Sequence, residues 1–549
     1  MIALDDFVFY YTDVEKPALD HISLKIQDGA FVLVTGPSGS GKTTFLRVLN
    51  GLVPHFYGGR IGGNALVYGL EAKEESVRRL SASVGMVFQD STAQFVTDTV
   101  EGEIAFGLEN IGLAGDEIAR RVDETAGLMG IKHLIGRQAA TLSGGERQKA
   151  AVASVMAMRP RVLALDEPTA ELDPDAAGEL LELLIKLNRE RGLTVILAEH
   201  RLERVVQFAD SIIELRSGKA EMGPTSEMAE SIVNAPPVIE LGRKMGWHPP
   251  PLSVEAARER IRLEPLTPTL SLPAGRQARR GREIVDKGSG PNCTVEKGPD
   301  PKTAVCAHGL SFSYDANKVL ENINLTFNDG QITALMGPNG AGKTTMLKLL
   351  CGLLKPASGS VTIGGLDTAK AKAADVFRIA GYVPQRPGAL LFADSVEEEV
   401  ASAASQPRND GITRARELID DFGLAGHEKD YPRDLSQGEQ QRVALAAILA
   451  NDPEIILFDE PTHGLDFAAK KAVSERLRGL ADGGKAVILA THDVETAARA
   501  ADRVIVIDGG KVAADGRPKD VMPKTPMLRT QMNEIFGGKT LTVEDVTGK

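Results

Sequence analysis

The sequence has few cysteines, and their spacing fits no metal-binding or disulfide framework. Only three occur in 549 residues, Cys293, Cys306 and Cys351, and no two of them form a CxxC pair. Small disulfide scaffolds and structural zinc sites both depend on paired or closely spaced cysteines. The sequence therefore argues against both classes, and we expect reduced thiols.

Long apolar runs are missing as well. No stretch approaches the roughly 20 apolar residues that a helix needs to cross a bilayer. The N-terminal residues Met1-Ile-Ala-Leu-Asp-Asp lack the charged start and the apolar core of an export signal. We therefore expect a cytoplasmic chain that does not span a membrane.

An excess of positive charge is also absent. The sequence has 63 lysines and arginines and 75 aspartates and glutamates, which gives a net charge of −12. This balance argues against general attraction to nucleic acid or to an anionic membrane surface, although a local basic patch could still bind either. The remaining composition, 42% hydrophobic and 25% charged, is ordinary for a globular protein. The length predicts two or more domains.

The sequence does contain one ordered set of motifs written twice. The first copy consists of GPSGSGKTT from Gly36, LSGGE from Leu142, an apolar run ending in Asp166 and Glu167, and His200. The second consists of GPNGAGKTT from Gly337, LSQGE from Leu435, an apolar run ending in Asp459 and Glu460, and His492. In both copies the aspartate lies 23 positions after the serine of the LSxGE motif. One GxxxxGK[ST] match alone is weak, but the ordered repeat indicates a structural unit copied whole.

Each copy begins with a predicted strand, a glycine-rich turn and a helix, the order that a phosphate-binding loop requires. The strands are the apolar runs 31–35 and 332–336. Glycine lets the backbone curl so that several N–H groups face a phosphate, and the following helix adds its positive end. Lys42 and Lys343 are expected to neutralise the β- and γ-phosphates. The predicted loop residues are Gly36, Pro37, Ser38, Gly39, Ser40, Gly41, Lys42, Thr43, Thr44, Gly337, Pro338, Asn339, Gly340, Ala341, Gly342, Lys343, Thr344 and Thr345.

Four polar residues in each copy are predicted to carry the chemistry. The aspartate after the apolar run is expected to hold Mg²⁺, directly or through water, together with the hydroxyl that follows the loop lysine. The next glutamate is expected to polarise the attacking water, and the later histidine to hydrogen-bond the γ-phosphate. A glutamine after a short strand reaches both metal and water without adding charge, although an exposed loop glutamine is the alternative. These residues are Gln89, Asp166, Glu167 and His200, then Gln385, Asp459, Glu460 and His492, with the hydroxyls of Thr43 and Thr344.

Two tyrosines precede the phosphate loops. Tyr314, and with it Tyr11, lies on an early predicted strand, where an aromatic face could stack on adenine. Core packing is the competing interpretation, and Tyr10 beside Tyr11 leaves the assignment open in the first copy.

With these motifs in this order, the chain resembles a tandem ATP-binding cassette (ABC) protein. The resemblance covers nearly everything except a connector and a tail, and it adds Asp173 and Asp466 as D-loop residues. In that family two cassettes pack head to tail, and each ATP lies between the phosphate loop of one cassette and the LSxGE signature of the other. The resemblance therefore implies ATP and Mg²⁺ as cofactors. The signature residues that it assigns to ATP are Ser143, Gly144, Gly145, Ser436, Gln437 and Gly438.

One signature position departs from the family pattern. Gln437 occupies the place of Gly144, the first of the two signature glycines in the first copy. This change puts equal turnover at the two sites in doubt. Because both copies keep the glutamate and the histidine, we expect two hydrolytic sites of unequal rate.

The predicted fold class is α/β, with two P-loop cassettes that each hold a mostly parallel core sheet, an antiparallel β layer and a helical subdomain. The first cassette is predicted to span 1–235 and the second 303–535. Prolines, glycines and arginines cluster without a sustained period between them, which predicts a connector over 236–302, ordered in parts at most. A C-terminal tail is predicted over 536–549.

The region after each glutamine is similar to that of ATPases in energy-coupling factor importers, the cobalt, nickel and vitamin uptake group. The similarity covers 88–110 and, more loosely, 384–400. It implies a peripheral motor at the cytoplasmic face of the membrane, which recruits a transmembrane coupling subunit and a substrate-binding membrane subunit. Acidic residues of both segments would suit contact with a basic coupling helix, although a solvated helix face is the alternative. They are Asp98, Glu101, Glu103, Glu397, Glu398 and Glu399.

Two other functions stay open. A fused sugar-importer ATPase would be expected to carry a weakened catalytic set in one half, which this chain does not. A soluble tandem cassette acting on the ribosome is favoured by a basic run in the connector, Arg276, Arg279, Arg280 and Arg282. The acidic net charge and the two histidines argue against it, and no nucleic acid partner is expected.

Overall fold

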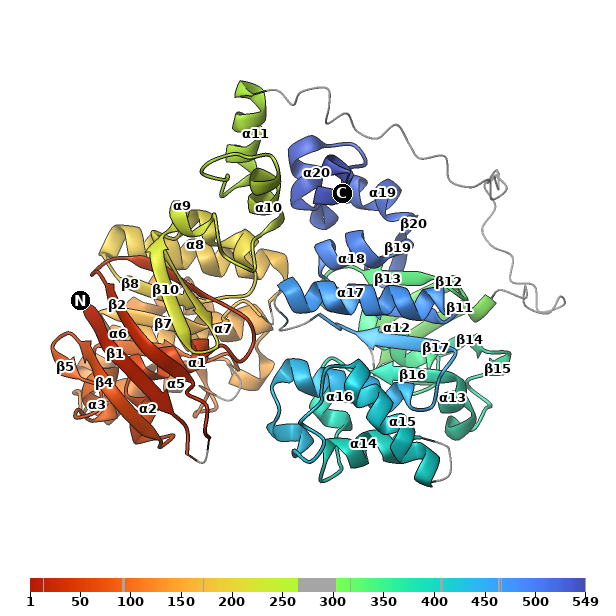
Figure 1. Cartoon of the computed structure of the whole chain (residues 1–549), viewed down its shortest axis with the longest axis horizontal. Coiled ribbons are helices and arrows are strands. Elements are labelled where there is room, and N and C mark those ends of the chain that lie inside the picture. The colour runs from red at the N-terminus through yellow and green to blue at the C-terminus, as the bar shows by residue number, and fades with distance from the viewer. Residues whose placement is uncertain are drawn as a thin grey trace. The chain divides into compact units, whose positions relative to one another are not determined.

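The computed structural model describes all residues except 13, 91–93, 171, 265–302, 316, 405–407, 463–464, 466 and 549. For 408–410, 437 and 468 it describes only the backbone. The chain divides into two compact units, one formed chiefly by Met1–Arg260 and the other by Ile261–Leu465 and Ala469–Lys549. Each unit holds one six-stranded and one four-stranded sheet (Figure 1).

The six-stranded sheet of the first unit has the order β10-β9-β3-β8-β7-β6. Strands β6 to β9 and β3 form its parallel part, and only β10 runs antiparallel, against β9. Every residue of β3, β7 and β8 is buried, as the continuous apolar runs predict for strands covered on both faces. The strands are β3 (Phe31–Thr35), β6 (Val84–Val87), β7 (Val162–Asp166), β8 (Thr194–Ala198), β9 (Ser211–Arg216) and β10 (Lys219–Pro224).

The four-stranded sheet of this unit is antiparallel and has the order β2-β1-β4-β5. Its inward residues share one buried cluster with helix α1 and with one face of the six-stranded sheet. The phosphate loop therefore lies between the two sheets, at the start of α1. The elements are β1 (Ile2–Tyr10), β2 (Leu19–Ile26), β4 (Arg60–Val67), β5 (Leu70–Glu71) and α1 (Lys42–Leu49).

Helices make up the rest of the first unit. Helices α5, α6 and α7 pack on one another and form a helical subdomain. The long helix α8 has its buried face against the core, with leucines at helical spacing. The helices are α2 (Leu52–His55), α3 (Val77–Ser81), α5 (Val100–Asn110), α6 (Gly115–Leu128), α7 (Gly144–Met156), α8 (Pro174–Arg191) and α9 (Thr225–Met228).

The second unit repeats this plan. Its sheets have the orders β16-β17-β18-β13-β19-β20 and β12-β11-β14-β15. The strands are β11 (Thr303–Tyr314), β12 (Asn317–Asn328), β13 (Ile332–Met336), β14 (Ser358–Ile363), β15 (Leu366–Asp367), β16 (Ala380–Val383), β17 (Ile455–Asp459), β18 (Ala486–Ala490), β19 (Arg503–Asp508) and β20 (Lys511–Gly516). The predicted α/β class, with a parallel core sheet and an antiparallel layer in each half, is confirmed.

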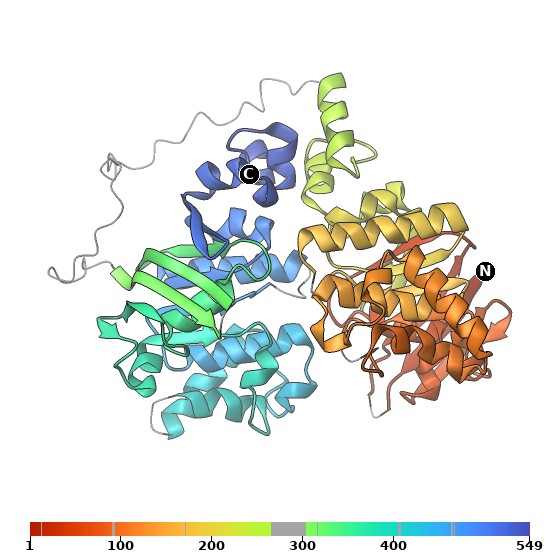
Figure 2. The ribbon, with the colours of Figure 1, turned by 180° about the vertical axis from the view of Figure 1, so that it is seen from behind.

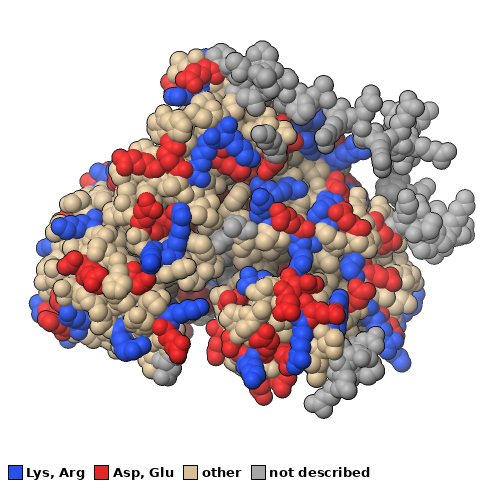
Figure 3. Space-filling model, in the orientation of Figure 1, with Lys and Arg blue, Asp and Glu red and all other residues tan. Residues whose placement is uncertain are grey.

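Helices of the second unit gather in two places. The subdomain helices α14, α15 and α16 lie together at one end of the sheet, and α19 and α20 lie beyond the opposite edge, past β20 (Figures 1 and 2). Acidic side chains, with some lysines and arginines among them, gather over the helical subdomain on the face that Figure 3 shows. The helices are α12 (Lys343–Leu350), α13 (Ala373–Ile379), α14 (Val396–Ala403), α15 (Arg408–Asp421), α16 (Gln437–Leu449), α17 (Phe467–Asp482), α18 (Val494–Ala500), α19 (Pro518–Val521), α20 (Gln531–Phe536) and α21 (Val543–Thr547).

Part of the segment predicted as a connector is helical. Helices α10 (Pro237–Lys244) and α11 (Val254–Leu263) lie within 236–264, and the rest of the predicted connector, with its arginine run, lies outside the described residues. Helix α10 buries an apolar face that Val238, Ile239 and Leu241 contribute. None of the helices that the structure describes is long and apolar enough to cross a membrane.

One cysteine tests the expectation of reduced thiols. Cys306 lies on β11, and Cys293 lies outside the described residues. Cys351 is free and buried, and burial raises the pKa of its thiol to about 11.

Candidate functional site

Both glycine-rich turns adopt backbone conformations that require glycine. Gly36 has a φ of 144° and Gly337 a φ of 146°. A Cβ atom at either position would lie 2.0 Å from a carbonyl oxygen, of Leu215 or of Ile507. The turn can therefore approach the neighbouring strand only with glycine at this place.

The loop lysines are folded onto their own loops. The Lys42 Nζ donates to the carbonyl oxygens of Gly36 at 2.9 Å and of Pro37 at 3.1 Å. Lys343 makes the same pair of bonds, at 2.8 and 3.0 Å. Both side chains are buried, and burial lowers the pKa of Lys343. Each ammonium group is thus fixed beside the start of a helix, where phosphate oxygens are favoured.

The aspartates that end β7 and β17 are buried next to the loop threonines. The Thr344 hydroxyl donates to Asp459 Oδ1 at 2.9 Å, and the Tyr382 hydroxyl donates to Oδ2 at 3.2 Å. In the first unit, burial raises the pKa of Asp166 to about 6, against a hydrogen bond from Thr43 that lowers it. Asp166 Oδ1 has no hydrogen-bond partner among the described residues.

These oxygen donors fit Mg²⁺. A carboxylate and a hydroxyl are the hard ligands that this ion prefers, and it is commonly bound by one or two carboxylates together with substrate phosphates. The described residues contain no group of three or more His, Cys, Asp and Glu side chains that could hold a metal ion by themselves. Asp166 with Thr43, and Asp459 with Thr344, would therefore hold Mg²⁺ jointly with a bound nucleotide.

The glutamates after these aspartates have left-handed backbone conformations. Their φ values are 49° at Glu167 and 54° at Glu460, which is uncommon for residues other than glycine and typical of functional sites. Both carboxylates meet the predicted histidine. His200 Nε2 lies 2.8 Å from Glu167 Oε1, and His492 Nδ1 lies 2.8 Å from Glu460 Oε1.

The surroundings of the two glutamates differ. In the first unit Gln89 Nε2 donates to Glu167 Oε2 at 3.0 Å. In the second unit the backbone N–H of His492 donates to Glu460 Oε2 at 3.3 Å, and the side chain of Gln385 is exposed. Burial by itself would raise the pKa of Glu460, but the bond and charge of His492, with Lys343, lower it overall. The predicted glutamine therefore joins the catalytic residues in one unit only.

The two tyrosines have similar packing but different exposure. Tyr11 packs edge-on against Phe9 with ring centroids 4.9 Å apart, and its hydroxyl lies 3.0 Å from Thr44 Oγ1. Tyr314 packs edge-on against Phe312 at 4.8 Å and is 46% exposed. A stacking role for either ring stays a prediction.

The signature serines have a structural task that the motif analysis missed. Ser143 and Ser436 are the N-cap residues of α7 and α16, and each forms a capping box with the glutamate three residues later. The Glu146 N–H donates to Ser143 Oγ at 3.3 Å, while the Ser143 N–H donates to the Glu146 carboxylate at 2.8 Å. The S-x-x-E spacing of both signatures would have revealed the box. The helix starts and the glycines of the first turn are thereby fixed.

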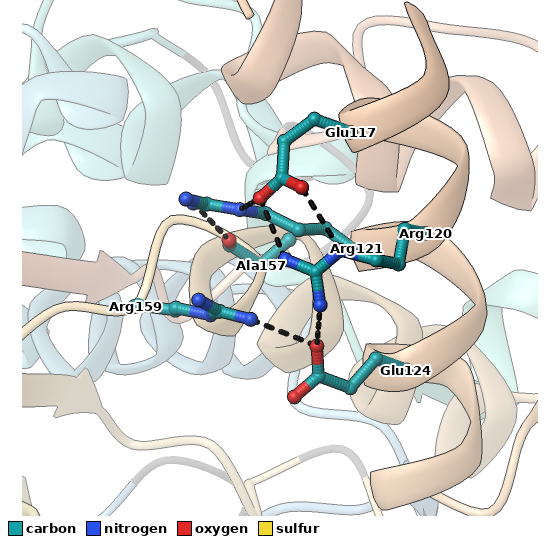
Figure 4. Close-up of polar contacts among 6 residues, drawn as sticks. All are labelled: Glu117, Arg120, Arg121, Glu124, Ala157 and Arg159. Atoms are coloured by element: carbon teal, nitrogen blue, oxygen red, sulfur yellow. Dashed lines mark hydrogen bonds and ion pairs between the residues drawn. The ribbon is translucent and has the colours of Figure 1, made fainter.

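A network of ion pairs holds the far end of the first signature helix (Figure 4). Arg121 Nε donates to Glu117 at 2.8 Å, and its guanidinium also reaches the carbonyl oxygen of Ala157, which caps α7. Just beyond, Arg159 donates to Glu124 at 2.8 Å. Helix α6 is thus joined to the end of α7.

Of the two predicted D-loop residues, the structure describes one. Asp173 is the N-cap of α8 and accepts a hydrogen bond from the Ala176 N–H at 2.8 Å. Asp466 lies outside the described residues.

Within each unit, the phosphate loop, the aspartate, the glutamate and the histidine come together at the carboxyl ends of three neighbouring parallel strands. The strands are β3, β7 and β8 in the first unit and β13, β17 and β18 in the second. This edge of an open α/β sheet is the usual place for a ligand. Chemically, the arrangement suits phosphate binding by the loop, metal binding by the aspartate and water activation by the glutamate, as the sequence predicts.

Comparison with known proteins agrees with this geometry. A family model described as ABC transporter matches residues 19–170 and again 320–463. An ABC transporter ATP-binding protein from Streptomyces coelicolor is 41% identical, and the alignment covers 100% of this chain and 99% of the relative. A protein of the same description from Methanosarcina acetivorans is 35% identical, with 96% and 86% covered. Another from Caldanaerobacter subterraneus is 34% identical, with 99% and 98% covered.

Two solved structures are also similar. One is cbiO1 from Clostridium perfringens, part of an ABC transporter complex, with 28% identity, a TM-score of 0.38 and coverage of 41% of this chain and 92% of that one. The other is a dimeric ATP-binding cassette in a post-hydrolysis state with ADP and phosphate, with 30% identity, a TM-score of 0.37 and coverage of 39% and 98%. The two family matches and the full-length relatives show that the chain belongs to the ABC transporter family, as an ATPase with two ATP-binding cassettes.

Proposed function

We propose that this ATPase is the motor subunit of a membrane importer of the energy-coupling factor kind. It would work at the cytoplasmic face of the membrane with a transmembrane coupling subunit and a substrate-binding membrane subunit. The solute would be small, such as a vitamin or a transition metal ion. The observation that carries the proposal is an exposed apolar residue presented at the same point of both cassettes.

That residue lies seven positions after the predicted glutamine in each half. It is Val96 in the first unit, 63% exposed, and Phe392 in the second, 74% exposed. Both precede the capped first turn of a subdomain helix, α5 or α14. Exposure of an apolar side chain at the same point of both cassettes supports a contact with another protein.

A buried glutamate holds each of these residues in place. Glu103 accepts hydrogen bonds from the N–H groups of Val96 and Thr97, at 2.9 and 3.1 Å. Glu399 accepts from Phe392 and Ala393, at 2.6 and 2.7 Å. The loop geometry is therefore set by the same clamp in both cassettes.

The clamp corrects part of the predicted partner surface. Glu103 is 4% exposed and Glu399 is 8% exposed, so neither can meet a basic coupling helix. Their carboxylates serve the loop instead. Asp98, Glu101 and Glu398 are exposed and stay in the proposed contact, and Glu397 already pairs with Arg416 at 2.6 Å.

In the proposed cycle, ATP binding closes two composite sites and hydrolysis releases them. Mg²⁺, when bound, would neutralise charge on the phosphates. The lysine and the loop N–H groups bind phosphate oxygens, the glutamate orients and polarises water, and the histidine holds that glutamate. The first site would combine Lys42, Asp166, Glu167 and His200 with Ser436 and Gly438. The second would combine Lys343, Asp459, Glu460 and His492 with Ser143, Gly144 and Gly145.

Aspartate substitutions on the two exposed residues test the proposal. Tagged full-length chain, purified from detergent-solubilised membranes of the producing cells, is expected to bring down a transmembrane protein and a small membrane protein. Phe392→Asp and Val96→Asp should each lower this recovery at least tenfold, because an apolar contact would be replaced by a charge.

Two exposed apolar residues elsewhere supply matched controls. Met527→Asp and Val233→Asp, at positions 41% and 48% exposed, should retain the membrane partners. Co-purification of ribosomes without any membrane protein would overturn the importer proposal in favour of the ribosomal one. Equal recovery with all four variants would show that the clamped loops are not the contact.

A further inference from the structure

We propose that Tyr382 is a positioning residue for the metal-binding carboxylate of the second cassette, and that the first cassette lacks an equivalent. This inference rests on the ATPase activity and not on the membrane partner. It starts from a hydrogen bond that the sequence motifs do not contain.

Two hydroxyl groups from different elements hold the carboxylate of Asp459. Thr344, on α12, donates to Oδ1 at 2.9 Å, and Tyr382, on the neighbouring strand β16, donates to Oδ2 at 3.2 Å. The aspartate is only 4% exposed. A carboxylate whose two oxygens both accept bonds from rigid elements is restricted to one orientation.

The first cassette has a methionine at this position. Met86 pairs with Ala164 across β6 and β7, the register that Tyr382 and Leu457 have across β16 and β17. Its thioether accepts a hydrogen bond from Asn50 Nδ2 at 3.2 Å. A thioether cannot donate, and Asp166 Oδ1 has no hydrogen-bond partner among the described residues.

The neighbour of this position changes as well. Asn50 and Cys351 each lie eight residues after the loop lysine, so Asn50 with Met86 corresponds to Cys351 with Tyr382. Both members of the pair differ, and the Cys351 thiol donates to the Lys348 carbonyl oxygen at 3.5 Å, while the Tyr382 hydroxyl donates to Asp459. The difference between the cassettes is therefore a matched replacement and not a single substitution.

Hydrogen bonds to metal-ligating groups commonly change metal affinity by about 10- to 100-fold. We therefore expect the second cassette to bind a divalent cation with its nucleotide more tightly than the first. This asymmetry adds to that of Gln437, which lies in the signature.

The test uses full-length chain, Mn²⁺ as a paramagnetic probe and a non-hydrolysable ATP analogue. Lys42→Ala removes nucleotide from the first phosphate loop, so that the Mn²⁺ affinity measured by electron paramagnetic resonance reports the second. In that background Tyr382→Phe, which deletes only the hydroxyl, should raise the Mn²⁺ Kd about tenfold. Analogue binding without divalent cation should stay within twofold.

Two further measurements complete the design. Tyr431→Phe, at another tyrosine of the same unit, should leave the Mn²⁺ Kd unchanged. In a Lys343→Ala background, which reports the first cassette, the pair Asn50→Cys with Met86→Tyr should lower the Kd severalfold. An Mn²⁺ Kd within twofold of the parent for Tyr382→Phe, or an equal loss of metal-free analogue binding, would overturn the proposal.

Discussion

At the scale of single residues, the carboxyl group of Glu199 is an unusual member of the first cassette. It directly precedes His200, is 2% exposed, and its Oε2 has no hydrogen-bond partner among the described residues. Burial, and then the charge of Glu167, raise its pKa above the ordinary 4.5. The second cassette has Thr491 at the same place, a neutral side chain.

This residue predicts a pH dependence of stability. Since the pKa is higher in the folded than in the unfolded chain, the folded chain keeps the proton at pH values above 4.5 where the unfolded chain has lost it. The contribution of Glu199 to stability therefore falls as pH rises from about 4.5 through the folded-state pKa. The Glu199→Gln variant should lack this fall in stability, because its amide side chain does not ionise.

Thermal unfolding at pH 5 and pH 8 measures the effect. Glu199→Gln should raise the melting temperature of the first cassette at pH 8 and change it little at pH 5. Glu190→Gln, at an exposed helix position, should change neither. A variant that melts as the parent does at both pH values would contradict the assignment.

Most residues of the candidate site could be predicted from the sequence, because phosphate binding demands particular residue types at fixed spacing. The loop lysines, the aspartates, the glutamates and the histidines all meet in space as their motif order implies. The roles of Tyr382 and Glu199 could not be predicted. Each depends on what a neighbouring element places beside it, and neither residue belongs to a motif.

At the scale of elements, the loops before α5 and α14 are fixed by their buried glutamates. Glu399→Ala would leave the N–H groups of Phe392 and Ala393 without their acceptor. Both bonds are partly buried, and hydrogen bonds to charged groups contribute about 1.5–3 kcal/mol, so the loop should open more often without them. Hydrogen exchange at these two amides should accelerate at least tenfold.

The neighbouring Glu398→Ala is the matched control. Its side chain is exposed and does not bind the loop amides, so exchange at Phe392 and Ala393 should remain slow. Unchanged exchange with Glu399→Ala would show that other contacts fix the loop.

Elements were predictable to different degrees. The runs 31–35 and 332–336 are strands β3 and β13, as continuous apolar stretches before a glycine-rich turn indicate. Helices α10 and α11 were not predicted individually, because prolines at 236, 237 and 249–251 mask the apolar spacing of that segment. Pro237 in fact begins α10, a position that tolerates proline since the first N–H groups of a helix have no partner in it.

At the scale of the whole molecule, one chain carries the predicted catalytic glutamate and its histidine in both cassettes. Glu167→Gln and Glu460→Gln, made separately, should each lower steady-state ATP turnover, and by unequal amounts. The double variant should lose about 100-fold or more, the range expected when general-base catalysis is removed. ATP binding should persist in all three, because the substitution keeps the size of the side chain.

Phosphate release and nucleotide binding, measured on the same preparations, separate an effect on ATP hydrolysis from an effect on ATP binding. A single variant with unchanged turnover would show that its cassette does not hydrolyse ATP.

The duplication itself could be predicted from the sequence, since each half repeats the motifs in order. The unlike surroundings of the two glutamates could not, because Gln89 and Gln385 are the same residue type in different local folds.

The clamped loops also bear on how a newly made chain behaves in the cell. Val96 and Phe392 have exposed side chains, and the buried glutamates fix the backbone at both positions. In the proposed assembly, each newly made chain would carry these two exposed apolar side chains until the membrane subunits cover them. If the proposed assembly holds, production of this chain in large excess over the membrane subunits should favour aggregation, and synthesis of all subunits together should keep the chain in solution.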